Sequence, residues 1–270
     1  MTKVSLSSPF GDEPLVEMPL SRAPLVRTLA QVRFPSLSVL AGGDAALRIA
    51  EALSDDYPIF HESQELTVQI SPDGVTQMPG GGRLWQLKSA DESWQVSFGQ
   101  SFLSLHTSNY IDRDDFCRRL QVAWEELSIA VKPPSIQRVG FRYINRVEDE
   151  AFLGNLGNMV RPEVVGGSAV PLNAGQLVSS FSENLYEVSP NHALQARWGI
   201  LPPNALLDPT LPGVDRKSWI LDLDSYRNYT PADGTDVDVV AVVADLGRAG
   251  YRFFRWAVTA EFLQEFGGEI

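Results

Sequence analysis

The chain has 270 residues, with 34 acidic against 22 basic residues and a single cysteine. With 44% hydrophobic and 10% aromatic residues it can bury a large core, which excludes global disorder. One cysteine cannot form an internal disulfide, and a net charge of −12 argues against general nucleic-acid binding, which needs a basic face. The N-terminus lacks a signal-peptide core and no stretch approaches the ~20 apolar residues of a membrane span. We therefore expect a cytoplasmic protein without membrane association.

The first half predicts an irregular arm followed by α+β structure. Residues 1–24 carry four prolines and little periodicity, which is typical of an irregular arm. Leu25–Phe34 has the composition of a strand that Pro35 ends. Asp44 is the expected N-cap of a short helix that reaches Leu53. Turn signals then separate four expected strands: Glu65–Ile70, Arg83–Lys88, Ser93–Gly99 and Phe102–Ser108.

A long helix is expected to close this half. Asp112 is its predicted N-cap, and Pro133 and Pro134 stop it. Its apolar residues recur at steps of three and four, as on the buried side of a helix. They are Phe116, Leu120, Ala123, Trp124 and Leu127.

The second half repeats this order of elements. Ser135–Val147 reads as a long strand and Glu148–Val160 as a weak helix, followed by a loop over 161–174. The remaining expected elements are strands Gln176–Val188, His192–Leu201 and Ser218–Tyr226, a helix from Asp236 to Trp256, and a short helix capped by Thr259 that ends at Gly267.

The pattern β-α-β-β-β-(β)-α thus occurs twice, with a split near residue 134. We predict an α+β protein in which a curved antiparallel sheet carries long helices on one face, as in saddle-like or helix-grip folds. The expected organisation is an arm over 1–24 and halves over 25–134 and 135–270 that pack as one continuous unit. The repeat is one of topology and not of residue identity, so either duplication or coincidence explains it.

Three segments resemble a known family. LVRTLAQVRFPSL, WQVSFGQSFLSLHTSNY and FCRRLQVAWEELSIAVKPPSIQRVGFRYINRVE are similar to a sporadically distributed bacterial family of proteins of 250–270 residues whose function is uncharacterised. The resemblance is clear over residues 22–148 and weak over the remainder. Sporadic distribution implies accessory genes of the kind found in defence or toxin–immunity islands. The resemblance supplies no catalytic motif, so no functional residue is carried over from it.

Motifs for catalysis or cofactors are not found in the sequence. Gly80-Gly81-Gly82 is not followed by the GK[ST] of a phosphate-binding loop and predicts a hairpin loop instead. The histidines, His61, His106 and His192, lie far apart and show no metal-ligand spacing. Cys117 lies beside the apolar side of a helix, where a buried thiol is expected. We expect no cofactor and no metal, and the sequence favours a non-enzymatic protein without settling the question.

Arginines share one face of two expected strands, because side chains alternate along a strand. Arg138, Arg142 and Arg146 oppose an apolar set on Ser135–Val147, and Arg27 and Arg33 do so on the opening strand. On Ser218–Tyr226 two carboxylates also share a face, and they are Asp222 and Asp224.

Two interpretations of this polar face stay open. It is either a site where Arg and Asp bind an anionic ligand, or a solvated face with cross-strand Arg–Asp pairs. Trp85 and Trp198 are a second candidate surface, since their strand faces are only partly apolar and interfaces are enriched in Trp.

Two functions follow as hypotheses. The first is a non-enzymatic interaction protein that serves as accessory partner of another bacterial protein, in defence or toxin neutralisation; the acidic surface suits a basic partner. The second is a protein that binds, or acts on, a small anionic ligand at the Arg/Asp-lined face. A loop or helix that covers this face would argue against the second.

Overall fold

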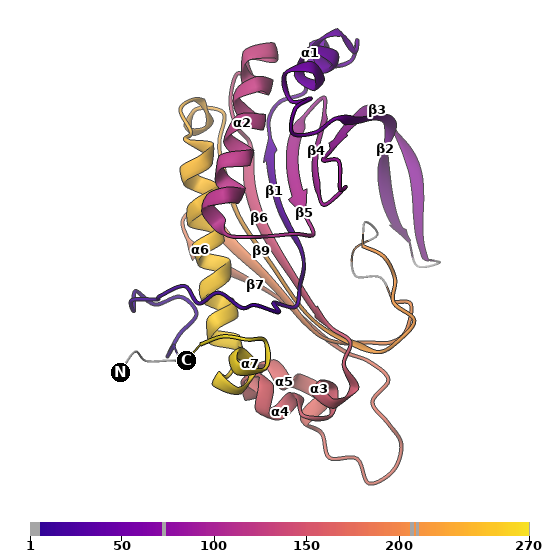
Figure 1. The fold of residues 1–270 in the computed structure, drawn as a ribbon, viewed down its shortest axis with the longest axis vertical. Coiled ribbons are helices and arrows are strands. Elements are labelled where there is room, and N and C mark those ends of the chain that lie inside the picture. Colours follow the sequence, from indigo (N-terminus) through magenta and orange to yellow (C-terminus); the bar gives the residue numbers. More distant parts are fainter. Residues whose placement is uncertain (1–5, 72–73, 206–207, 209–210, 270) are drawn as a thin grey trace. The chain divides into compact units, whose positions relative to one another are not determined.

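The computed structural model describes residues 6–71, 74–205, 208 and 211–269, with side chains described outside 65–81. Its class is α+β: nine strands form one open antiparallel sheet in the order β2-β3-β4-β5-β1-β6-β9-β8-β7, accompanied by seven α-helices in the described part of the chain (Figure 1). The predicted fold class and antiparallel sheet are therefore confirmed. The internal duplication and its boundary near residue 134 stay predictions.

The bounds of the strands and helices are as follows. The strands are β1 (Leu25–Arg33), β2 (Ile59–Ser71), β3 (Gly74–Lys88), β4 (Trp94–Gly99), β5 (Phe102–Thr107), β6 (Arg138–Val147), β7 (Ser180–Ser189), β8 (His192–Leu201) and β9 (Ser218–Asn228). The helices are α1 (Asp44–Ala52), α2 (Arg113–Val131), α3 (Glu150–Gly154), α4 (Leu156–Met159), α5 (Pro162–Val165), α6 (Val239–Ala257) and α7 (Ala260–Glu265), with 3-10 turns η1 (Ser38–Leu40), η2 (Gly166–Ala169) and η3 (Asp233–Thr235).

The chain separates into two compact units. The first comprises Met1–Arg27, Arg142–Tyr226 and Leu246–Ile270, and the second comprises Thr28–Phe141 and Arg227–Asp245. The division falls within β1, β6, β9 and α6.

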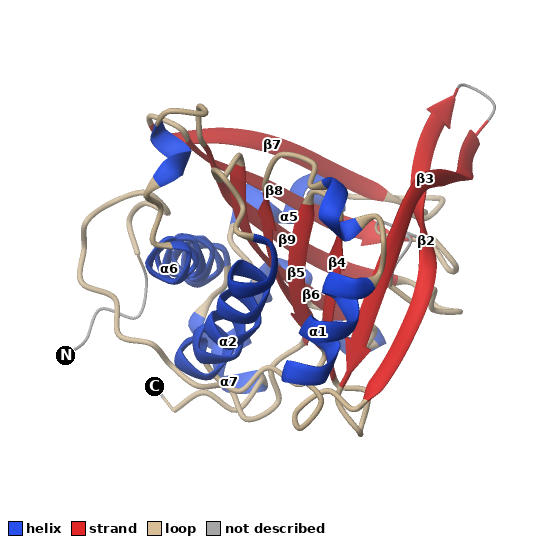
Figure 2. Cartoon of the chain, turned by 90° about the horizontal axis from the view of Figure 1, so that it is seen from above, coloured by secondary structure: helices blue, strands red, loops and turns tan. Residues whose placement is uncertain are grey.

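In the second unit, α2 forms as its sequence predicts. The Asp112 carboxylate accepts a hydrogen bond from the Asp115 amide at 2.7 Å, which caps the first turn. Phe116, Leu120, Ala123 and Leu127 are buried, and α1 packs beside α2 (Figure 2). The Phe116 ring contacts Phe141 edge to face at 5.1 Å between centroids, so one aromatic residue joins the helix to β6.

Three local expectations were wrong. The N-cap of α1 is Gly43, with a positive φ of 88°, and Asp44 is the first helical residue. The single helix expected over Glu148–Val160 is divided into α3 and α4, because Gly154 and Gly157 weaken a continuous helix here. The short helix α5 occupies part of the expected loop and starts at Pro162, a residue suited to the first turn of a helix. Gly80–Gly82, expected in a hairpin loop, lie within β3.

The first unit has its core between the sheet and the second half of α6. Phe253, Phe254 and Ala257 of that helix are buried against alternate residues of β8 and β9. Phe262 of α7 joins the same cluster, and the Thr259 hydroxyl caps α7 by accepting from the Phe262 amide at 3.2 Å, as predicted.

Arginines tie the N-terminal arm to this unit, although the sequence predicts only irregular chain there. Arg252 Nη1 donates to the Glu13 carbonyl at 2.7 Å, and Arg255 Nη1 donates to the Val16 carbonyl at 3.3 Å. Arg161 donates to the Leu6 carbonyl, and the Tyr251 hydroxyl accepts from the Met18 amide at 2.7 Å. The described part of the arm, from residue 6 onward, is therefore packed on the first unit.

Removing two of these arginines should release the arm. We expect the double variant Arg161→Ala/Arg252→Ala to lower the free energy of unfolding by about 1–3 kcal/mol, because charged donors to carbonyls are lost. Amide exchange of the peptide over 6–18 should accelerate, as measured by mass spectrometry. Arg118→Ala is the matched control, since that side chain is 62% exposed and pairs only at the surface of α2 in the described structure. Unchanged exchange in the double variant would contradict the assignment.

Candidate functional site

Two of the sequence-predicted residues meet directly. Arg142 on β6 and Asp222 on β9 form a two-pronged pair: Nε lies 2.7 Å from Asp222 Oδ1, and Nη2 lies 2.8 Å from Oδ2. The planar guanidinium matches the carboxylate in this geometry, which a lysine cannot reproduce. The Asp222 side chain has 0% exposure and that of Arg142 has 15%, so the pair is shielded from solvent.

Two further charges complete the group, which we call the Arg142 network: Arg142, Asp222, Arg197 and Asp208. Arg142 Nη1 donates to Asp208 Oδ2 at 2.6 Å, and Arg197 of β8 donates to Asp222 Oδ2. Burial alone would lower the pKa of the Arg142 guanidinium, but the hydrogen bonds and charge of Asp222 and the charge of Asp208 outweigh it and raise this pKa. The network holds two cations and two anions and needs no external ion for balance.

A loop covers this part of the polar face. Asp208 comes from the segment between β8 and β9, and Leu211 of the same segment is buried with Ile144 and Ile220. Arg146 Nη1 donates to the Pro212 carbonyl at 3.0 Å. Arg142 and Arg146, which the sequence offered either as anion ligands or as members of cross-strand Arg–Asp pairs, are thus directed at the protein's own loop and carboxylates.

The other predicted residues lie around the network or away from it. Burial lowers the pKa of the Arg27 guanidinium. The negative charge of Asp208 raises this pKa, and the positive charge of Arg142 lowers it further. Arg146 Nε lies 3.2 Å from Glu148 Oε1 and forms no hydrogen bond with it, so this contact is an ion pair. Asp224 acts on Arg142 through its charge.

Arg33 and Arg138 take no part in the network. Arg33 is exposed at the end of β1, and the Arg138 guanidinium lies over Gly140, where Nη1 would be 3.2 Å from an added Cβ. Strand alternation therefore placed these side chains on a shared face, and of the seven candidates the structure joins Arg142 and Asp222 by two hydrogen bonds.

The tryptophans chosen as interface candidates are buried. Trp85 is 1% exposed and stacks on Phe98, with 5.7 Å between ring centroids; Trp198 is 7% exposed and contacts Phe253. The expected exposure of both side chains is wrong, because their strand positions belong to the faces that the helices cover.

The exposed apolar side chains lie elsewhere and were missed by the sequence reading. Five of the 13 exposed large hydrophobic residues found in the described part of the chain lie within 170–185. They are Val170 at 59%, Leu172 at 52%, Val178 at 59%, Phe181 at 42% and Leu185 at 64%. We call these five side chains the β7 apolar surface, since the last two stand on β7 and the others precede it. Contiguous exposed apolar patches are typical of interaction sites, and these five residues lie close together along one segment of the chain.

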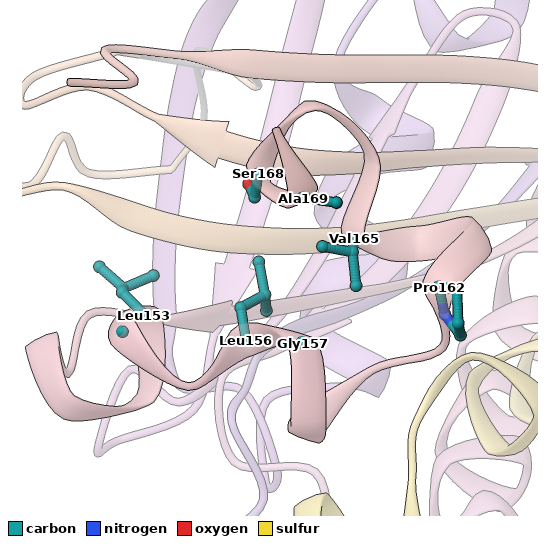
Figure 3. A pocket seen from close by; sticks show the side chains of 8 residues that line it. Leu153, Leu156, Gly157, Pro162, Val165, Ser168 and Ala169 are labelled. Atoms are coloured by element: carbon teal, nitrogen blue, oxygen red, sulfur yellow. The ribbon is translucent and has the colours of Figure 1, made fainter. Parts of the chain in front are cut away.

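A pocket lies among the short helices of the first unit. Its volume is about 320 Å³, and it is lined mainly by apolar groups, with no charged side chain (Figure 3). Leu156, Val165 and Ser168 point toward the same space. The Ser168 hydroxyl is buried without a hydrogen-bond partner among the described residues. Chemically, the pocket suits a small apolar group and not an anion.

Titratable clusters are sparse among the residues the structure describes. No three His, Cys, Asp or Glu side chains there are placed to hold a metal ion. His192 Nε2 lies 2.9 Å from Ser225 Oγ, and both residues are buried in the core. Cys117 is buried, as predicted.

No helix in the described part of the chain combines the length and apolarity that a membrane span requires.

Comparison with known proteins adds no assignment to this geometry. No protein-family model matches the chain, and no curated protein is significantly similar to it.

The Arg142 network should behave as a structural element. We expect Arg142→Ala to lower the free energy of unfolding by about 3–5 kcal/mol, because it leaves the buried Asp222 carboxylate short of its main partner. Arg142→Lys should lose an intermediate amount, since the charge stays but the two-pronged contact is lost. Urea unfolding monitored by tryptophan fluorescence measures both. Arg216→Ala, at a 63% exposed surface pair, is the control and should change stability by less than about 0.5 kcal/mol.

Proposed function

We propose that this protein is a non-enzymatic interaction protein that binds another protein through the β7 apolar surface. The observation that carries the proposal is the concentration of Val170, Leu172, Val178, Phe181 and Leu185 in one stretch of a single compact unit. Each apolar side chain left in water costs free energy that a partner surface would recover. The other exposed hydrophobic residues, such as Leu47 of α1 and Ile129 of α2, are spread over several elements of the described chain, as is common at protein surfaces.

The charge of the chain supports a basic partner. A net charge of −12 attracts a cationic protein over distance and disfavours association between two copies. The resemblance to a sporadically distributed bacterial family supports a role as accessory partner in a defence or toxin-neutralising system. We propose that the protein acts in the cytoplasm, together with this partner.

Polar substitutions in the β7 apolar surface should abolish partner binding without unfolding the protein. The test pair is Val178→Ser/Leu185→Ser, and the matched control is Leu47→Ser/Ile129→Ser. All four side chains are at least 58% exposed, so each substitution should leave stability within about 0.5 kcal/mol. Tagged versions expressed in the source bacterium are compared by quantitative mass spectrometry, and the recovered protein is purified and titrated by calorimetry.

The expected result is a stoichiometric protein that wild type and control variant bind alike. The test variant should bind it at least about tenfold more weakly, a loss of about 1.4 kcal/mol. Equal binding by test and control variants would overturn the proposal, as would self-association that the test variant abolishes.

A further inference from the structure

We propose that the partner presents an extended, basic segment that pairs with the outer edge of β7 as a tenth strand of the sheet. This inference rests on the proposed function, and it specifies the binding mode and the chemistry of the partner. Strand addition is a common recognition mode, in which backbone hydrogen bonds supply affinity and alternate side chains supply specificity.

The outer edge of β7 is suited to strand addition. β7 stands at the end of the sheet order, and no other strand in the described part of the chain pairs with its outer side. Its pairing with β8 is regular from Ser180 opposite Ile200 to Glu187 opposite Ala193, so most of this 10-residue strand is well formed, and the register shifts only between Glu187 and Ser189. The sequence SFSENLYEVS contains no Pro, Lys or Arg, which are the residues that usually protect an edge strand from pairing.

One face of β7 is fixed by the core. The Tyr186 ring lies 5.1 Å from that of Phe10 and 5.8 Å from that of Phe253, between centroids. Gly167 of η2 lies so close to Ser180 that an added Cβ would be 2.8 Å from its hydroxyl. The strand is therefore held in its extended form before a partner arrives, which lowers the entropic cost of binding.

The opposite face of β7 alternates apolar and acidic side chains. Phe181, Glu183, Leu185 and Glu187 are all exposed and share this face. Arg197 is opposite Glu183 on β8, but it donates to Asp222 in the Arg142 network. The Glu183 carboxylate accepts instead from the neutral Gln195 amide.

This pattern selects the partner. In an added strand, side chains directly opposite Glu183 and Glu187 lie within reach of the carboxylates, so Lys or Arg is favoured there and Asp or Glu is disfavoured. Apolar side chains at the alternating positions would cover Phe181 and Leu185. A second copy of β7 would bring four carboxylates and no cation to the same face, so self-pairing is disfavoured.

Two synthetic peptides of the length of β7 test the proposal. The first, the Lys/Val peptide, repeats Val-Ser-Lys-Ser, so that Val and Lys alternate along one face of the added strand. The second, the Glu/Val peptide, repeats Val-Ser-Glu-Ser. We expect the Lys/Val peptide to slow amide exchange of β7 residues, measured by NMR, and to bind more weakly as salt is added. The Glu/Val peptide should leave β7 exchange unchanged.

A charge reversal then tests the partner chemistry. Glu183→Lys/Glu187→Lys should weaken binding of the Lys/Val peptide by at least about fivefold and strengthen binding of the Glu/Val peptide. The control Glu51→Lys/Glu125→Lys changes the net charge equally at exposed positions of α1 and α2, and should leave both affinities within about twofold.

The outcomes separate this inference from the function it rests on. Unprotected β7 amides at millimolar Lys/Val peptide, or equal binding of both peptides, overturn strand addition by a basic segment. If a partner from the source bacterium still depends on Val178 and Leu185, the interaction function stands and only the binding mode is wrong. Protection of β7 together with reversed preference in the Glu183→Lys/Glu187→Lys variant supports the inference.

Discussion

The buried carboxylate of Asp222 is the constraint on which the first unit depends. A charge without solvent must be paired and hydrogen-bonded, because the cost of desolvation is several kcal/mol. Here Arg142 and Arg197 supply the partners from the strands β6 and β8. Asp208 also pairs with Arg142, which balances the second positive charge of the network and brings the Asp208 loop onto the sheet. One polar residue therefore determines the positions of three strands and a loop.

This constraint gives the arginines on the sheet a structural role. A chain with a net charge of −12 can place a cation within the sheet face, but each such cation is expensive to bury without a carboxylate. Arg142 is enclosed by two of them. The polar face thus contributes to the uniqueness of the fold, and binding is left to surfaces where side chains are still exposed. The acidic excess is carried outward, where the proposed basic partner would meet it.

Strand alternation predicted the faces of β1, β6 and β9 because it depends only on neighbours along the chain. It could not predict that the loop after β8 would cover Arg142, since contacts such as Arg142–Asp208 join residues 66 positions apart. The same limit explains Trp85 and Trp198: their faces were judged half-apolar from the sequence, whereas burial depends on which helix packs over them. Capping by Asp112 and Thr259, a purely local interaction, was predicted correctly.

The β7 apolar surface shows most directly what the sequence leaves open. A strand near this position was expected, and its alternation of Phe181, Glu183, Leu185 and Glu187 was available in the sequence. The same alternation would be ordinary in an inner strand, where neighbours on both sides cover part of each side chain. We propose it as a binding pattern because β7 ends the sheet, and sheet order follows from topology and not from local residues. The glutamates then have two consequences at one edge. They oppose pairing between copies of the acidic chain, and they leave the edge open to a strand of opposite charge.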